Sequence, residues 1–547
     1  MARPINVLEY LEAQAAARPG KTAFADAKTS LTYAQLAADA RAVGCFVAGK
    51  TGPRRPVAVL ANKSCAAVSA FLGIVYAGCF YAQLDPKHPA ARLTSILDTL
   101  QPAVILTDEA GEMAAARLDL GDVVRAPISA ALSRRPAQNA APTPPSISAF
   151  SSDPATTQKS AVPSPPAPLR PAIPDPLPAV LQARRRAFAD TDPLYAMFTS
   201  GSTGRPKGVL VCHRSVVDFI ETFADTFGFD ATDVFGNQAP LDFDVSTKDL
   251  YTGLKCGARV ELLERQLFSS PARLAERLDA RGVTALVWAV SALVIVSTVD
   301  ALAETKPRAL RSVLFSGETM PLKHLAYWRA HYPDARFVNL YGPTEITCNC
   351  TYYEIKPGET FAEESALPIG APFPNERVFL LDGADREITA PGETGELCVA
   401  GTCLALGYLN DPERTRASFC RDPRNPGWPE TIYRTGDLAC WGADGLLYFR
   451  SRRDFQIKHM GHRIELQEIE LHLQAVPGVD RCCCVFFKER QRVVAFYEGA
   501  ATARELVAAL RAKLPSYMIP QGFERLDRLP VTPNGKLDRA KLRASAE

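Results

Sequence analysis

Apolar and polar positions alternate along most of the chain as short apolar runs followed by longer amphipathic stretches. Residues 57–60 and 104–107 are short apolar runs that predict buried strands, and the apolar-rich stretch 66–77 predicts a helix packed beside them. The same pattern resumes at residues 195–198 and continues to about residue 450. Strands that alternate with helices predict an α/β fold of layered sheets with covering helices.

The last ninety or so residues show a different mixture. Residues 485–487 and 492–497 predict strands, and residues 503–514 predict a helix. A chain of 547 residues also exceeds the usual size of one domain. We therefore expect a large N-terminal domain over residues 1–453 and a small C-terminal α+β domain over residues 454–547.

One segment interrupts the pattern of the large domain. Residues 127–187 are crowded with Pro, Ala and Ser, as in Ala-Pro-Thr-Pro-Pro at 141–145. Such a composition cannot bury enough apolar surface to offset the entropy lost on ordering. We expect most of this segment to be a disordered insertion or linker, and a docking tether is the alternative.

The longest uncharged run lies at residues 283–299. It contains several hydroxyl side chains, is flanked by Arg281 and Asp300, and falls short of the ~18 apolar residues typical of a membrane-spanning helix. We expect a buried strand over 283–287 that runs into a buried helix. The first residues include Glu9 and no long apolar core, so they do not form a signal peptide.

Composition and charge limit the kinds of molecule that the protein is expected to bind. Hydrophobic residues make up 47% of the chain, charged residues 22%, and the net charge is +2, as in a soluble globular protein without a nucleic-acid or membrane partner. Among the 14 cysteines, Cys482, Cys483 and Cys484 are adjacent in a predicted strand and point to opposite faces, so they cannot form a ligand set. Cys348 and Cys350 lack partners at zinc spacing, and we expect the reduced thiols of a cytoplasmic protein.

The strongest chemical signal is a loop rich in Gly and hydroxyl residues, which reads Thr199-Ser200-Gly201-Ser202-Thr203-Gly204-Arg205-Pro206-Lys207-Gly208. Its glycines allow backbone N–H groups to converge on phosphate oxygens, its hydroxyls add donors, and Lys207 adds a positive charge. The spacing is not that of a Walker loop. An ordinary flexible loop is the alternative for such a turn alone, but a strand before it and an apolar run after it favour a phosphate site.

Four further motifs follow this loop along the chain. They are Asn-Leu-Tyr-Gly-Pro-Thr-Glu at 339–345, Tyr-Arg-Thr-Gly-Asp at 433–437, the segment 452–470, and Pro-Asn-Gly-Lys-Leu-Asp at 533–538. With residues 195–209 they resemble the ordered motifs of the adenylate-forming superfamily, which contains acyl- and aryl-CoA ligases, luciferases and the adenylation domains of nonribosomal peptide synthetases. The resemblance spans about residues 5–545, apart from the Pro-rich insertion, and implies an enzyme that uses ATP and Mg²⁺ to activate a carboxylic acid as an acyl-AMP.

The resemblance also implies roles for individual residues. Glu345, helped by the Thr199 hydroxyl, would bind Mg²⁺, and Lys536 would bridge the substrate carboxylate and the α-phosphate. Tyr341 would face the adenine, with Asn339 and Gly317 beside the base. The nucleotide-binding set would be completed by Ser200, Gly201, Ser202, Thr203, Gly204, Lys207, Gly342, Thr344, Asp437 for the ribose hydroxyls, and Arg452 for the ribose or the α-phosphate.

A hinge is implied at Asp454, about which the small domain of the family turns. A second conformation would withdraw Lys536 and bring the segment with Lys458 and Gly461 to the site for thiol attack, so we expect the small domain to be mobile. Ser451 stands where the family usually has Gly, which affects only the local turn.

The substrate side is implied by Phe-Asp-Val-Ser at 243–246, which is similar to the amino-acid-activating branch. There Asp244 would pair with the α-ammonium of an amino acid, and the alternative is that it caps a helix starting near Thr247. The resemblance places the pocket lining at Val245, Lys248, Val287, Leu314, Ser316, Leu340, Cys348 and Asn349. Lys248 could recognise an acidic side chain, pair with Asp249 or point to solvent, and the sequence leaves these three open.

These features predict a stand-alone adenylation enzyme, similar also to D-alanine–carrier-protein ligases. It would convert an amino acid and ATP into aminoacyl-AMP and pyrophosphate, and then acylate the phosphopantetheine thiol of a separate acyl or peptidyl carrier protein. One alternative is an acyl- or aryl-CoA ligase on the same fold. Another is a catalytically silent binding scaffold, against which Glu345, Asp437 and Lys536 argue.

Overall fold

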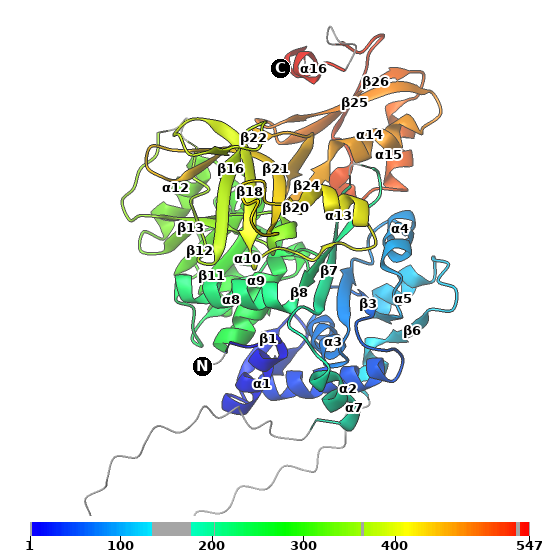
Figure 1. Ribbon diagram of the computed structural model, residues 1–547, viewed down its shortest axis with the longest axis vertical. Helices are drawn as coiled ribbons and strands as arrows, with labels where there is room; N and C mark the ends of the chain where they lie inside the picture. Colours follow the sequence, from blue (N-terminus) through cyan, green and yellow to red (C-terminus); the bar gives the residue numbers. More distant parts are fainter. Residues whose placement is uncertain (1–2, 134–176, 202, 363–365, 532–536, 546–547) are drawn as a thin grey trace, which may run out of the picture.

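The computed structural model describes residues 3–133, 177–201, 203–362, 366–531 and 537–545. Two large sheets with intervening helices form the main body, a third sheet flanks them, and a small domain sits at one end (Figure 1). This mixed α/β architecture agrees with the fold class predicted from the sequence.

The largest sheet has nine strands, and its central neighbours from β13 to β1 run parallel. In spatial order its strands are β15 (Ala371–Pro372), β14 (Thr351–Ile355), β13 (Arg336–Tyr341), β12 (Ser312–Ser316), β11 (Ala285–Ala289), β9 (Val234–Asn237), β10 (Arg259–Leu262), β1 (Thr22–Ala25) and β2 (Ser30–Thr32).

The second sheet has seven strands: β7, β4, β3, β5 and β6 run parallel, β8 is antiparallel to β7, and β19 is antiparallel to β8. In order they are β19 (Gly407–Tyr408), β8 (Lys207–Cys212), β7 (Pro193–Thr199), β4 (Phe80–Leu84), β3 (Pro56–Leu60), β5 (Val104–Thr107) and β6 (Val124–Pro127).

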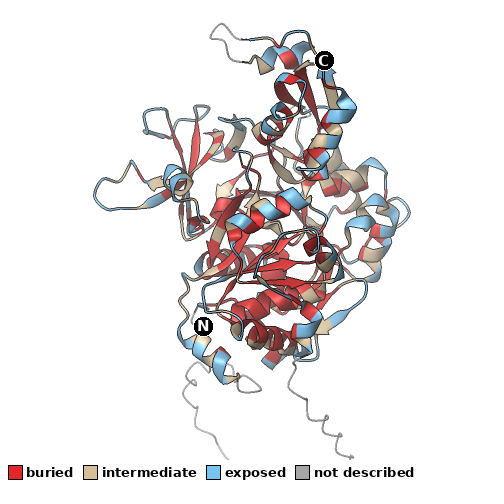
Figure 2. Ribbon diagram, turned by 90° about the vertical axis from the view of Figure 1, so that its right-hand side faces the viewer, coloured by how far each residue is buried: buried red, intermediate tan, exposed pale blue. Residues whose placement is uncertain are grey.

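Helices fill the space between these two sheets and cover their outer faces, and the central layers are the most buried part of the molecule (Figure 2). The inner helices are α1 (Leu8–Ala17), α2 (Tyr33–Ala48), α3 (Cys65–Tyr76), α8 (His213–Phe227) and α9 (Val245–Cys256). The outer ones are α4 (Ala90–Leu100) and α5 (Glu109–Ala115) on the seven-stranded sheet, and α10 (Pro271–Ala280), α11 (Val290–Thr298) and α12 (Leu322–His331) on the nine-stranded sheet. Strand β3 shows why both faces are covered: Val57 and Val59 pack on the inner helices, whereas Ala58 and Leu60 pack on the outer ones.

A third, antiparallel sheet flanks this body. Its strands are β17 (Glu387–Ile388), β16 (Glu376–Leu381), β18 (Thr394–Gly401), β21 (Thr431–Trp441), β20 (Phe419–Arg421) and β22 (Leu447–Arg452), which pairs with β21. Helix α13 (Pro412–Ser418) connects β19 to β20.

The small domain contains the hairpin β23 (Gln456–His459) and β24 (His462–Glu465), and a sheet of β25 (Val479–Phe487), β26 (Arg492–Gly499) and β27 (Gly522–Arg525). Helices α14 (Leu466–Gln474) and α15 (Ala503–Arg511) cover one face of that sheet, and α16 (Arg539–Ser545) covers the other. Cys482 and Cys484 face α14 and α15, whereas Cys483 faces α16, so the three adjacent thiols do point to opposite sides.

Several element predictions are confirmed within one residue, including β3, β5 and α3, whereas α15 starts as predicted but ends three residues earlier. The run at 283–299 is a strand and a helix, as predicted, but β11 begins two residues later than expected. Across the described residues, no helix combines the length and the apolar character needed to cross a membrane.

The predicted disordered segment 127–187 needs a correction at both ends. Helices α6 (Ile128–Leu132) and α7 (Ala179–Arg186) occupy its edges, and Ile128, Ala131 and Leu181 are buried in the central core. These few apolar side chains find a preformed surface on α2 and α3, which composition alone does not reveal. Residues 134–176, the body of the predicted insertion, lie outside the described residues.

Candidate active site

The predicted site residues gather where the parallel strands of both large sheets end. Strand β7 ends at Thr199, β12 at Ser316 and β13 at Tyr341, and helix α9 begins directly after Asp244. Carboxyl ends of parallel strands meet at one edge of a sheet, where α/β proteins bind their ligands. The motifs that the sequence spreads over more than 250 residues thus converge on one region.

The Gly-rich loop forms the turn between the antiparallel strands β7 and β8, in which Thr199 pairs with Lys207. A Cβ atom at Gly201 would lie 2.2 Å from the Arg205 carbonyl oxygen, so only glycine fits there. Gly204 has a φ of +77°, which also favours glycine. Ser202 lies outside the described residues.

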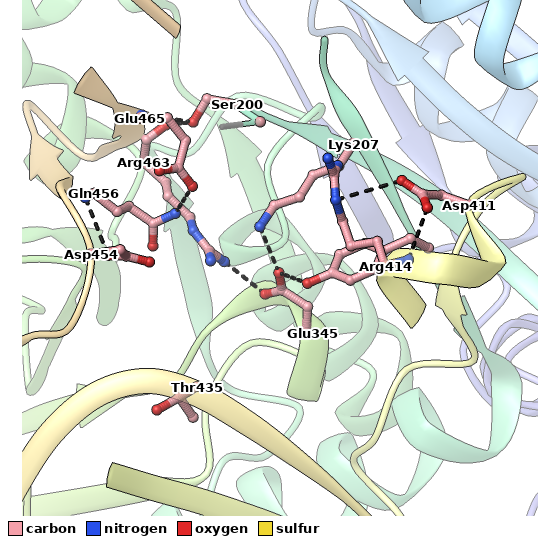
Figure 3. A network of polar contacts seen from close by, with 12 residues as sticks. Ser200, Lys207, Glu345, Asp411, Arg414, Thr435, Asp454, Gln456, Arg463 and Glu465 are labelled. Atoms are coloured by element: carbon pink, nitrogen blue, oxygen red, sulfur yellow. Dashed lines mark hydrogen bonds and ion pairs between the residues drawn. The ribbon is translucent and has the colours of Figure 1, made fainter. Parts of the chain in front are cut away.

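Glu345 forms the electrostatic centre of the site (Figure 3). It lies on the 3₁₀ turn η2 (Thr344–Ile346), is fully buried, and meets Lys207 Nζ at 3.1 Å, Arg463 Nη1 at 2.7 Å and the Tyr408 hydroxyl at 2.8 Å. Burial by itself would raise the pKa of the Glu345 carboxyl, but the charges of Arg463 and Lys207 hold it well below its usual range. Glu345 is therefore an anion matched by two cations.

Glu345 and Thr199 provide oxygens that fit the predicted Mg²⁺. The Thr199 hydroxyl is buried without a hydrogen-bond partner, and Mg²⁺ commonly binds through one or two protein oxygens together with substrate phosphates. The described residues contain no group of three or more His, Cys, Asp or Glu side chains placed to hold a metal. In this structure both Glu345 oxygens are engaged by Lys207, Tyr408 and Arg463, so a metal at Glu345 would require one of these contacts to open.

The side chains of the predicted ribose site form hydrogen bonds with other residues of the chain. Asp437 accepts hydrogen bonds from the Tyr341 hydroxyl and, at 2.5 Å, from Arg452 Nη1. Arg452 also donates to both oxygens of Asp454, at 2.7 and 2.9 Å. These contacts tie the predicted ribose-binding residues directly to the predicted hinge.

The predicted adenine side is partly preorganised. A Cβ atom at Gly342 would lie 2.5 Å from the Asn349 Cα, and Gly317 has a φ of +97°, so both positions require glycine. Asn339 donates to the Pro368 carbonyl oxygen at 2.8 Å, which fixes its side-chain amide. Asn339 therefore shapes the wall of the site, with its NH₂ group already engaged.

The hairpin β23–β24 of the small domain is inserted into this site. Lys458 Nζ lies 5.6 Å from the centre of the Tyr341 ring, and the Gly461 N–H donates to Glu318 Oε1 at 3.0 Å. The segment of Lys458 and Gly461 therefore lies at the predicted site, which is where the resemblance places it in the second conformation. Lys536 lies outside the described residues, and its neighbour Leu537 packs on the face of β25–β26 opposite α14.

Residues of the small domain also form hydrogen bonds with the Gly-rich loop at 199–208, the predicted phosphate loop. Ser200 Oγ donates to the Arg463 carbonyl oxygen at 2.7 Å and accepts from the Glu465 N–H at 3.2 Å, while the Gly201 N–H donates to Glu468 Oε2 at 3.1 Å. Glu468 is held by Arg92 of α4 at 3.0 Å, in a pair that is buried on both sides. A carboxylate thus binds a backbone N–H group expected to bind phosphate.

Asp244 lies on the substrate side of the site. It is the N-cap residue of α9, yet its side chain makes no capping hydrogen bond, so the helix-capping alternative is wrong. Burial raises the pKa of its carboxyl, while a hydrogen bond from Thr344 and the charge of Lys248 act in the opposite direction. The carboxyl lines a cavity together with Thr199, Thr344 and Arg463.

The remaining predicted pocket residues lie around the start of α9. Val287, Leu314, Leu340 and Cys348 are buried in the central core, with Val245 packed against it. Lys248 is fully buried, which excludes the solvent alternative. Its Nζ contacts Ser316 and Asn349, and its neighbour Asp249 bonds instead to Asn237 Nδ2 at 2.7 Å.

Three important contacts were not predicted from the sequence, although Arg463 lies within the motif segment 452–470. Tyr408 and Arg463 complete the Glu345 cluster, and Arg414 donates to Thr203 Oγ1 at 3.3 Å. Tyr408 follows an irregular loop, and Arg463 belongs to another domain, so neither spacing nor periodicity links them to Glu345.

Comparisons with known proteins agree with this geometry. The family model described as "AMP-binding enzyme" matches residues 11–409, and the model of the "AMP-binding enzyme C-terminal domain" matches residues 468–536. The chain belongs to the AMP-binding enzyme family. The resemblance seen in the sequence motifs is thereby confirmed.

Relatives within this family are multidomain synthases and shorter ligases. The chain is 31% identical to a dimodular nonribosomal peptide synthase of Bacillus subtilis over 99% of its own length, but it spans only 21% of that protein. It is 32% identical to an L-proline–[L-prolyl-carrier protein] ligase of Streptomyces coelicolor, covering 97% of this chain and 94% of the ligase. It is 29% identical to a D-alanine–D-alanyl carrier protein ligase of Bacillus cytotoxicus, covering 98% and 99%.

Solved structures give the same result for the fold. Holo-PA1221, described as a nonribosomal peptide synthetase protein with adenylation and carrier domains bound to a vinylsulfonamide inhibitor, is 26% identical, with a TM-score of 0.77 over 99% of this chain and 84% of that one. The adenylation domain AlmE of Vibrio cholerae is 20% identical, with a TM-score of 0.80 over 100% and 98%.

Proposed function

We propose that this AMP-binding enzyme activates an amino acid as aminoacyl-AMP, with release of pyrophosphate, and then transfers it to the phosphopantetheine thiol of a carrier protein. The observation that carries this proposal is Asp244, a carboxylate that caps no helix and opens into the cavity beside Thr199 and Thr344. A carboxylate in a buried wall needs a cationic partner, and the α-ammonium of an amino acid supplies one. The carrier-protein ligases among the relatives support the same reaction.

The first step is an attack by the substrate carboxylate on the α-phosphate of ATP. Two anions must approach each other, so the site lowers the barrier chiefly by positioning and by neutralising charge. Asp244 orients the amino acid, Lys207 and the loop N–H groups face the phosphates, and Asp437 takes the ribose hydroxyls. Lys536 acts where charge develops between carboxylate and phosphate. When bound at Glu345 and Thr199, Mg²⁺ would neutralise phosphate charge.

The second step uses the arrangement seen in the structure. Arg463 and Glu468 contact Glu345 and the phosphate loop, so pyrophosphate must leave before the hairpin can enter. The carrier thiol then attacks the acyl carbon, the C–O bond to AMP breaks, and AMP leaves with both electrons of that bond. We infer that the small domain, from residue 454, turns about Asp454 between the two steps.

We also place the enzyme in the cytoplasm. All 14 cysteines are free thiols in the structure, which agrees with a reducing compartment.

Amino-acid-dependent exchange of pyrophosphate into ATP tests the proposal. A panel of amino acids, each paired with the analogue that lacks the α-amino group, is expected to give exchange with at least one amino acid and little with its analogue. Exchange with aryl or fatty acids alone, or acylation of free coenzyme A in place of a carrier protein, would favour an acyl- or aryl-CoA ligase. No exchange with any acid would favour a silent scaffold.

A further inference from the structure

A buried lysine lies in the first turns of helix α9 and contacts two neutral polar side chains. The side chain of Lys248 has an exposed fraction of 0%. Its Nζ donates to Asn349 Oδ1 at 2.8 Å and to Ser316 Oγ at 3.3 Å. Both acceptors are neutral, so the hydrogen bonds solvate the ammonium group without neutralising its charge.

Within the described part of the chain, Lys248 forms no ion pair with a carboxylate. Asp249, its neighbour in the sequence, bonds to Asn237 and feels the charges of both Lys248 and Lys63, while burial raises the pKa of Asp249 to about 7. Asp244 lies beyond ion-pair distance and already has a role toward the α-ammonium. A buried cation among neutral groups is costly unless a counter-charge arrives.

Asp244 and Lys248 are four residues apart at the start of α9, so they lie on one face of the helix, separated by a rise of ~6 Å. The start of α9 thus carries an anion suited to an ammonium group and, one turn further along the helix, a cation suited to an anion. The two residues before Asn349, Thr347 and Cys348, both have positive φ, at 57° and 83°, which is a costly conformation for residues other than glycine.

From this arrangement we propose that the activated amino acid has an acidic side chain, whose carboxylate pairs with Lys248 and is also bound by Ser316 and Asn349. The Ser316 hydroxyl and the Asn349 NH₂ group can each donate to a carboxylate while Lys248 remains their neighbour. This inference rests on the proposed amino-acid-activating function and specifies its substrate class.

Pyrophosphate exchange with aspartate and glutamate, compared with asparagine, glutamine and alanine, tests the inference. An acidic substrate is expected to exceed its own amide by about 100-fold in kcat/KM, because a site built for a charged group rejects a neutral isostere strongly. Exchange confined to neutral amino acids would overturn the acidic-substrate inference and leave the proposed function intact. Exchange with no amino acid would instead overturn the proposed function itself.

Two substitutions probe Lys248 directly. Lys248→Met keeps a long side chain and removes the charge. It is expected to lower kcat/KM for the acidic substrate by about 100-fold and to raise kcat/KM for the corresponding amide. Asn349→Asp places a carboxylate beside Nζ within the protein, and should weaken binding of the acidic substrate by competing for Lys248. Unchanged preference for the acidic substrate in Lys248→Met would overturn the assignment.

Lys255→Met is the matched control on the same helix. Lys255 Nζ pairs with Glu221 at 3.0 Å and Asp225 at 2.7 Å, away from the pocket, so its removal should leave the acid-to-amide preference unchanged. Thermal unfolding of each variant separates loss of the fold from loss of preference. Replacing an unpaired buried charge by an apolar side chain of similar volume is expected to preserve or raise stability.

Discussion

The carboxylate of Glu345 receives donors from three separate parts of the chain. Lys207 belongs to the predicted phosphate loop, but Tyr408 comes from strand β19 and Arg463 from the small domain. The motifs identified Glu345 and Lys207 because their residue types suit phosphate and metal. They did not include Tyr408, and they included Arg463 only as part of the segment 452–470, because the contacts of both with Glu345 arise only when distant strands meet. At the scale of single residues, the sequence predicts the ligand-facing groups better than the partners that position them.

Asp244 allows a direct residue-scale prediction. Asp244→Asn removes the charge that pairs with the α-ammonium at nearly constant volume. Breaking a buried ion pair from one side costs about 3 kcal/mol, so kcat/KM for the amino acid in pyrophosphate exchange should fall roughly 100-fold. An Asp244→Asn enzyme with wild-type kcat/KM would contradict the role given to this carboxyl.

The pH dependence of the same carboxyl gives a second prediction. Burial raises the pKa of Asp244 above its ordinary 3.8, and only the ionised form can pair with the ammonium group. The value of kcat/KM, which reports the free enzyme, should therefore fall as the pH drops through this raised pKa. In the Asp244→Asn variant this fall of kcat/KM at low pH, the acidic limb of the pH profile, should disappear. A wild-type limb with its midpoint at or below 3.8 would contradict the prediction.

At the scale of elements, strands and helices of the two large sheets were predictable, whereas the hairpin β23–β24 was not. Strand β3 and helix α3 have side chains that face apolar layers, so hydrophobic periodicity marks them. In the hairpin, Lys458 and Arg463 face polar groups of the active site, whereas His459 packs on Phe486 and His462 stacks on Tyr517. A strand that packs against a charged site carries no apolar alternation.

Arg463 gives a prediction for this hairpin. Arg463→Ala removes the 2.7 Å ion pair with Glu345, which exists only while the hairpin is inserted. Transfer from a preformed aminoacyl-AMP to the carrier thiol should slow by about 10-fold or more, whereas pyrophosphate exchange should be preserved. Arg481→Ala, which alters the long 3.9 Å contact with Glu498 elsewhere in the small domain, is the control and should affect neither step. Equal slowing of both steps by Arg463→Ala would contradict the two-step assignment.

At the scale of the whole molecule, the motif order predicted two domains and a second arrangement of the small one, and the structure shows the hairpin at the site. The edges of the Pro-rich segment were not predicted, since α6 and α7 depend on the surface of α2 and α3. The order of elements along the chain does not reveal that α6 and α7 pack on α2 and α3.

A disulfide across the two domains tests whether the small domain must move. A Cβ built at Gly204 of the phosphate loop lies 3.8 Å from the Leu471 Cβ of α14, the mean separation in disulfides. The double variant Gly204→Cys and Leu471→Cys should cross-link on oxidation and lose most of its pyrophosphate exchange relative to its own reduced form. Comparison of one protein in two redox states removes the effect of altering Gly204, and oxidised wild type controls for the native thiols. Equal exchange in both redox states of the cross-linked variant would show that adenylation needs no movement.

The central claim, that the substrate carboxylate attacks the α-phosphate, is tested most directly by isotope transfer. An amino acid labelled with ¹⁸O in its carboxylate is incubated with the enzyme, ATP, Mg²⁺ and carrier protein, and the nucleotide products are analysed by mass spectrometry. Aminoacyl-AMP formation followed by thiol attack at the acyl carbon predicts AMP that carries one ¹⁸O atom. ADP as the product, or AMP without the label, would contradict the account.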